Sequence, residues 1–215
     1  MRVSRLVPSL VVLGVWLAAA PPAGAHRVDE YLQATRIALG IDRIDLEMDL
    51  TAGTAVASAV FAWIDTNGDG RISDTEREGY AQEFLRSVAL SIDGRRVPIS
   101  LAEIRVPELA DMRLGTGTIR VRAIGKIAAQ WMGHHQVSYS NAHRRESSVY
   151  LVNALMPDDA RIQIADQRRD SAQHGLTLEY TVKADPRWAS LLLVGLAMAG
   201  ALGVSRLPRP RAFES

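Results

Sequence analysis

Apolar and polar residues alternate along several short stretches of this chain. In the clearest stretch, every second residue from Ile44 to Leu50 is aliphatic or methionine, and the residues between them are acidic. A period of two residues places one set of side chains on a buried face and the other in solvent, which predicts a β-strand. Similar stretches occur at 31–39, 88–92, 97–101, 119–123, 135–140, 148–155, 162–164 and 176–182. Short strands at this spacing predict a mainly β fold, an antiparallel β-sandwich.

Two stretches with helical periodicity interrupt the strand pattern between the second and third predicted strands. The first covers 55–64 and follows Thr54, whose side chain can cap a helix N-terminus. The second runs from about 74 to 85 and turns its aromatic residues to one face. We therefore expect a helix–loop–helix insertion at 54–86.

The twelve residues between these helices, 65–76, carry oxygen-bearing side chains at loop positions 1, 3, 5, 9 and 12. Position 6 is Gly70, and a residue without Cβ permits a sharp turn there. Ca2+ prefers about seven oxygen ligands at roughly 2.3–2.6 Å, so the spacing predicts a calcium site. Its ligands would be the side chains of Asp65, Asn67, Asp69, Ser73 and Glu76, together with the main-chain carbonyl of Arg71.

Residues 55–85 resemble the EF-hand family of calcium-binding helix–loop–helix units. Besides the loop spacing, the resemblance includes Phe61 and Ile64 on one face of the first helix and the aliphatic Ile72 at loop position 8. The sequence differs from the family at Arg77, where many EF-hands have an apolar residue. EF-hands usually work in pairs, and the sequence contains no second loop of this kind. A solvated turn between two helices is the alternative interpretation.

Composition narrows the range of functions. The 215 residues are 47% hydrophobic and 23% charged, as expected for one globular domain with membrane-related segments added. There are no cysteines, which excludes thiolate nucleophiles and thiolate metal ligands in this sequence. The basic excess lies at the two ends of the chain, so nothing indicates a nucleic-acid partner. Because no Gly-x-Ser-x-Gly element or other catalytic constellation is present, we expect a binding module and not an enzyme.

Residues 1–25 have the features of a secretory signal peptide. Arg2 and Arg5 precede an apolar run, and the small residues at 23–25 fit the specificity of signal peptidase. We therefore expect cleavage after Ala25 and a mature chain that begins at His26. An uncleaved N-terminal anchor is the alternative.

A second apolar segment lies near the C-terminus. Residues 188–205 carry no charge, and a helix of this length, at about 1.5 Å per residue, nearly crosses a hydrocarbon core of roughly 30 Å. The following tail, 206–215, contains three arginines, and basic residues stay on the cytoplasmic side. This predicts one transmembrane helix, a cytoplasmic C-terminus, and a main domain, 26–187, in the periplasm or extracellular space. A buried core helix is the alternative for 188–205.

Possible partners follow from the same segment. Gly195, Ala199 and Gly203 lie four residues apart, and small residues at that spacing let two helices approach closely, so a homodimer is one hypothesis. Ordinary small-residue composition explains the spacing equally well. The membrane is the one partner that the sequence identifies, and a protein partner, such as another membrane protein, stays unknown.

A transition-metal site is a second hypothesis. A mature N-terminal His26 would offer its amine and its imidazole to one ion, and His134, His135 or His143 could complete the site, because imidazole suits copper, nickel and zinc. The start at His26, the strands and the membrane segment resemble, in arrangement, the exported domains of hydrogenase and urease accessory membrane proteins. That resemblance implies a role in Cu or Ni handling. Polar loop and strand-end histidines are the more ordinary interpretation.

The function that best fits these patterns is a calcium-binding, membrane-anchored exported interaction module. Calcium is abundant outside cells, and extracellular modules of this loop type bind it with a Kd of roughly 10⁻⁴–10⁻³ M. We therefore expect Ca2+ to have a mainly structural role, pinning two helices against the sheets. Accessory handling of Cu or Ni is the alternative.

Overall fold

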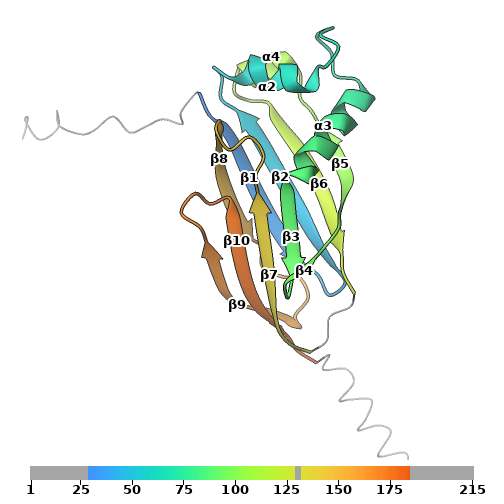
Figure 1. Cartoon of the computed structure of the whole chain (residues 1–215), viewed down its shortest axis with the longest axis vertical. Helices are drawn as coiled ribbons and strands as arrows, with labels where there is room; N and C mark the ends of the chain where they lie inside the picture. Colours follow the sequence, from blue (N-terminus) through green and yellow to red (C-terminus); the bar gives the residue numbers. More distant parts are fainter. Residues whose placement is uncertain (1–28, 129–131, 185–215) are drawn as a thin grey trace, which may run out of the picture.

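Two five-stranded β-sheets pack face to face and enclose one apolar core (Figure 1). The computed structural model describes residues 29–128 and 132–184. The predicted signal peptide, 1–25, and the predicted membrane segment, 188–205, lie outside the described residues, as does His26. Within those described ranges, no helix is long and apolar enough to cross a membrane.

The first sheet has the strand order β5-β6-β2-β1-β8 and the second has the order β4-β3-β7-β10-β9. The first consists of β1 (Tyr31–Leu39), β2 (Arg43–Ala52), β5 (Ile99–Arg105), β6 (Thr118–Lys126) and β8 (Ser148–Ala154). The second consists of β3 (Val88–Ile92), β4 (Arg95–Arg96), β7 (Gly133–Asn141), β9 (Ile162–Arg169) and β10 (Gly175–Val182). The mainly β prediction is confirmed, and the arrangement is consistent with a β-sandwich; we call it the two-sheet domain.

Strand alternation produces the core as the sequence predicts. Along β2, the apolar side chains from Ile44 to Leu50 are at most 1% exposed, whereas the acidic residues between them lie on the outer face. The same alternation runs along β1 and β10. Apolar residues from both sheets, such as Met48 and Leu178, belong to one buried cluster, so the sheets stabilise each other by removing apolar surface from water.

One strand pairing departs from the predicted antiparallel pattern. β1 and β8 pair in parallel, with Tyr31 opposite Ser148. The reason is topological: β7 finishes at the end of the domain where β1 begins, and the chain crosses there to the other sheet. β8 therefore runs in the same direction as β1. The predicted strand at 97–101 also differs, because Pro98 separates the short β4 from β5 and cannot donate a ladder hydrogen bond.

The three helices of the described residues lie at one end of the two-sheet domain (Figure 1). They are α2 (Ala57–Ile64), α3 (Asp74–Arg86) and the unpredicted short α4 (Leu109–Arg113). The predicted cap at Thr54 does not form, because α2 begins after Val56 without a side-chain cap. By contrast, α3 begins with a complete capping box between Ser73 and Glu76. We call α2, the loop 65–76 and α3 the helical hairpin; it is inserted between β2 and β3 as predicted.

Aromatic contacts fix the helical hairpin to the sheets. The hydroxyls of Tyr80 on α3 and Tyr31 on β1 lie 2.6 Å apart, and both side chains are buried. The rings of Phe84 and His143 lie 5.1 Å apart, edge to face. Because burial raises the pKa of Tyr80 to about 12, its hydroxyl stays neutral and available for hydrogen bonding at physiological pH. These contacts join residues that are far apart in the sequence, so α3 and β1 form one packed unit.

A buried polar network holds the turn after β7 against the same end of the domain. The side-chain amide of Gln33 donates to the His143 carbonyl (2.9 Å), and the Asn141 amide donates to Gln33 Oε1 (2.8 Å). The hydroxyl of Tyr150 donates to the same His143 carbonyl (2.7 Å). Buried polar groups need such partners, since an unpaired one costs about 1–3 kcal/mol. The network therefore sets the position of His143 below the helical hairpin.

The Tyr31–Tyr80 pair predicts a non-additive effect on stability. Tyr31→Phe or Tyr80→Phe alone leaves the other buried hydroxyl without this partner, which should cost about 1–3 kcal/mol in the free energy of unfolding. The double variant removes both hydroxyls and should cost less than the sum of the two single changes. Denaturant unfolding of all four proteins measures the coupling, and additive costs would contradict the contact.

Candidate metal centre

Three side chains of the loop 65–76 fold back onto the loop backbone. Asp65 Oδ1 accepts from the Gly68 N–H (2.8 Å), and its Oδ2 accepts from the Gly70 N–H (2.9 Å). Asn67 Oδ1 accepts from the Asp69 N–H (2.8 Å). Gly68 and Gly70 have φ values of 71° and 80°, in the left-handed region that glycine adopts without strain. The alternation of short polar residues and glycines thus folds this stretch into consecutive tight turns.

Asp69 continues the same series of turns. Its Oδ1 accepts from the Arg71 N–H (2.8 Å), and its Oδ2 accepts from the Asn67 side-chain amide (3.3 Å). Arg71 itself is exposed, so its positive charge is in solvent. Three of the predicted ligands, Asp65, Asn67 and Asp69, therefore lie within one continuous hydrogen-bonded turn of chain.

Glu76 connects the end of the loop with its beginning. Its Oε1 accepts from the backbone N–H groups of Thr66 (2.9 Å) and Asn67 (3.1 Å) and from the Thr66 hydroxyl (3.1 Å). Its Oε2 accepts from the N–H (3.0 Å) and hydroxyl (2.7 Å) of Ser73. Hydrogen bonds from Ser73, supported by those from Asn67 and Thr66, lower the pKa of Glu76 to about 2. The carboxylate is ionised at neutral pH, and Glu76 as a whole residue is 9% exposed.

The chemistry of the donors fits a hard cation. All six predicted ligands are oxygen donors, three of them carboxylates, and such a set suits Ca2+ better than a transition metal. In the described parts of the chain, no three His, Asp or Glu side chains gather as a ready-made metal-binding group. Glu76 Oε1 already accepts three hydrogen bonds. Two-oxygen coordination by Glu76 would therefore require Thr66 and Asn67 to release it.

The candidate histidines lie far apart. His143 is 2% exposed and is surrounded by Tyr31, Tyr80 and Phe84, and burial lowers its pKa to about 4. His135 lies near the start of β7, with its Nδ1 2.8 Å from Asp93 Oδ2.

His143 lies just past the other end of β7, and the six strand steps from His135 to Asn141 alone span roughly 20 Å. One ion therefore cannot contact both histidines. Pairing of either histidine with His26, which lies outside the described residues, stays a prediction.

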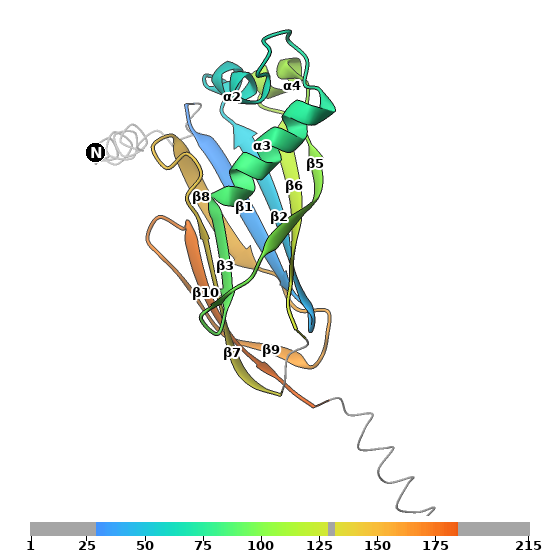
Figure 2. The same ribbon diagram turned by 45° about the vertical axis from the view of Figure 1, so that its right-hand side comes forward.

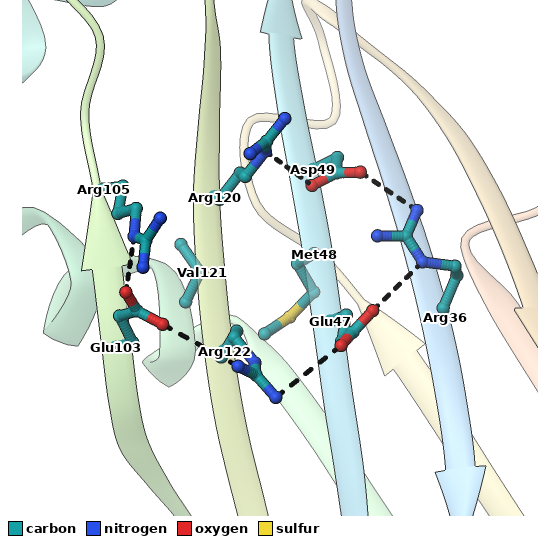
Figure 3. A pocket seen from close by; sticks show the side chains of 9 residues that line it. All are labelled: Arg36, Glu47, Met48, Asp49, Glu103, Arg105, Arg120, Val121 and Arg122. Atoms are coloured by element: carbon teal, nitrogen blue, oxygen red, sulfur yellow. Dashed lines mark hydrogen bonds and ion pairs between the residues drawn. The ribbon is translucent and has the colours of Figure 1, made fainter.

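The outer face of the first sheet carries a cavity of about 300 Å³ with a dense set of charges (Figure 3). Arg36 pairs with Glu47 (3.3 Å) and with Asp49 (3.0 Å). Arg120 lies 4.0 Å from Asp49. Arg122 lies 3.8 Å from Glu47. Because these arginines already have carboxylate neighbours, the surface is a solvated set of cross-strand ion pairs, and it has no free positive charge directed at an anion.

Two features of the centre could not be found in the sequence. Thr66, at loop position 2, donates twice to Glu76, although nothing in the loop spacing marks it as a partner. Trp63 receives the Arg144 guanidinium 4.3 Å above its ring, a contact between residues 81 positions apart. A long-range contact of this kind leaves no local signal in the sequence.

No protein-family model matches this chain, and no curated protein matches it. A family therefore cannot be assigned from relatives. The assignment of the loop depends on the chemistry and geometry of its own residues.

The pKa of Glu76 predicts a window of acid sensitivity. Folding lowers this pKa from 4.5 to about 2, so its contribution to stability is complete above pH 4.5 and is lost as the pH falls to about 2. The difference in unfolding free energy between the wild type and Glu76→Gln should therefore narrow over that window. Denaturant unfolding at several pH values measures it, and Glu78→Gln, an exposed change on the same helix, is the control. A constant difference would show that Glu76 does not titrate in this way.

Proposed function

We propose that the loop 65–76 binds Ca2+ as an EF-hand-like unit within a β-sandwich that is exported and anchored to a membrane. The ion has a mainly structural role, and the module functions by interaction and not by catalysis. One observation carries the proposal. Asp65, Asn67 and Asp69 are ordered in consecutive turns of one loop, and Glu76 returns from α3 to the first residues of that loop.

The side chains of Asp65, Asn67, Asp69, Ser73 and Glu76 and the carbonyl of Arg71 would hold the ion. A divalent cation supplies positive charge among three carboxylates that otherwise repel one another. It would join the first residues of the loop to the start of α3 more strongly than the neutral donors of Thr66 and Asn67 do. The ion would thereby stabilise the whole helical hairpin.

The position of the hairpin favours a structural role over a regulatory one. α3 is held against the sheets by Tyr80 and Phe84, and the turn at Arg144 covers Trp63 on α2. A hairpin fixed on both helices has little freedom to open and expose a new surface. Calcium should therefore increase the stability of the helical hairpin without changing its position on the sheets.

Calcium should bind at one site and raise stability. At a hundredfold excess over Kd, an ion that binds only the folded state adds about 2.7 kcal/mol to the unfolding free energy. Calorimetry should detect one site, and thermal unfolding with calcium should occur at a higher temperature than with chelator. Glu76→Gln removes one charge and one strong ligand oxygen. The Kd for calcium should therefore rise at least tenfold, and the calcium-dependent rise in unfolding temperature should become smaller.

Glu78→Gln is the matched control for this experiment. It makes the same change on the same helix, at an exposed position outside the loop, and should bind calcium as the wild type does. Equal calcium affinity of the wild type and Glu76→Gln would overturn the proposal.

The membrane part of the proposal follows from the sequence at both ends of the chain. The features of 1–25 favour export, and the apolar length of 188–205 with the arginines that follow favours one span with the C-terminus inside. In spheroplasts, added protease should digest the two-sheet domain, while a tag placed after Ser215 should survive. A protected domain or a digested tag would contradict this orientation.

A further inference from the structure

The two ends of the two-sheet domain differ in the segments that cover them. The helical hairpin covers the end where β2 finishes, whereas β10 finishes at the opposite end (Figures 1 and 2). The ten residues of β2 span about 34 Å between those ends. The end that contains Ala184, which we call the distal end, is therefore remote from the loop 65–76.

Three of the six large apolar side chains that are exposed in the described residues lie at the distal end. Met132 precedes β7 and is 69% exposed, and Met156, in the connection from β8 to β9, is 85% exposed. Leu155, beside it, is 37% exposed. All three lie in connections that cross from one sheet to the other at this end. Apolar side chains exposed at one end of the domain are available to contact an apolar or amphipathic partner there.

Basic side chains occupy the same end. A cavity of about 530 Å³ lies between the β3–β4 turn and the end of β6, and Arg95, Arg96 and Lys126 line it. Lys183 follows β10 directly and is exposed. Across the described residues, Arg96, Lys126 and Lys183 have no ion-pair partner, so their charges are available to a ligand.

The acids at the distal end offset part of this charge. Asp159 is paired with Arg161, whereas Asp93 contacts His135, which is charged only when protonated, so Asp42, Asp93 and Asp158 are the acids at this end that have no ion pair with an arginine or lysine among the described residues. Four basic side chains, including Arg95, stand against these three acids, which leaves a small basic excess. A surface of this kind, basic with exposed methionines, matches the headgroup region of an anionic bilayer.

The length of chain beyond Ala184 restricts where the distal end can lie. Trp188, the first residue of the predicted span, is four residues further on, and four extended residues reach at most about 14 Å. If 188–205 crosses the bilayer, the distal end must stay within that distance of the lipid. This step rests on the anchoring part of the proposed function.

We propose that the distal end is a docking surface for anionic phospholipid. The cavity of Arg95, Arg96 and Lys126 takes lipid phosphate groups, and Met132 and Met156 enter the headgroup layer. The domain thereby stands upright on the membrane, with the loop 65–76 directed away from it into the surrounding fluid.

The absence of cysteine makes a direct test practicable. Full-length chains carrying Met132→Cys, Met156→Cys or Leu114→Cys, each labelled with an environment-sensitive fluorophore, are reconstituted singly in nanodiscs. Leu114, 73% exposed and adjacent to α4 at the opposite end, is the matched control. Quenchers attached to lipid headgroups should quench the labels at 132 and 156 several-fold more than the label at 114. The difference should shrink in purely zwitterionic nanodiscs and in the variant Arg96→Glu/Lys126→Glu.

Three other outcomes would each overturn the docking proposal, and each would show a different reason for its failure. If the chain stays in the bilayer on carbonate extraction but all three labels are equally unquenched, lipid docking is wrong and anchoring stands. If the chain is extracted, anchoring and docking both fail, while calcium binding is judged by its own measurement. If the labels at 132 and 156 are shielded in detergent as much as in nanodiscs, and the unlabelled Met156→Cys variant forms crosslinked dimers, the surface binds a second copy of the chain and not lipid.

Discussion

The hydrogen bonds accepted by Glu76 connect the local structure of the helical hairpin to its tertiary position. Through Ser73, this carboxylate caps α3, and through Thr66 and Asn67 it closes the loop that precedes the helix. The orientation of α3 that results places Tyr80 and Phe84 against β1 and the turn after β7. Loss of this one charge would therefore loosen the loop, the helix start and the contact with the sheets together.

The same hydrogen bonds influence how tightly an ion could bind to the loop. Five hydrogen bonds already stabilise the Glu76 carboxylate, so a cation competes with internal donors and not merely with water. Such competition reduces apparent affinity, because only the surplus over the lost hydrogen bonds contributes to binding. A weak site is adequate where calcium is plentiful, so this competition is compatible with the structural role proposed for the ion.

Features encoded by neighbouring residues were predictable, and features that depend on remote residues were not. The alternation along β2 and the start of the second helix near Asp74 act within a few residues, and the sequence places both in the right elements. The predicted cap at Thr54 is wrong, and the capping pair Ser73 and Glu76 was not predicted, although both residues were named as loop ligands. The parallel pairing of β1 with β8 and the Tyr31–Tyr80 contact join segments 49 or more positions apart. The spacing of the loop identified candidate ligands, but it could not indicate that Glu76 would be engaged by Thr66.

The parallel pairing of β1 and β8 also constrains the order of folding. β1 lies inside the first sheet, and its outer edge is completed only by β8, whose Ser148 lies opposite Tyr31. Contacts so distant in the chain form slowly, because a large loop must close before they gain any stability. Until more than a hundred further residues have emerged, the backbone groups on that edge of β1 have no strand partner. A nascent chain of this protein therefore exposes a strand edge open to misassociation, and it would benefit from a chaperone until β8 arrives.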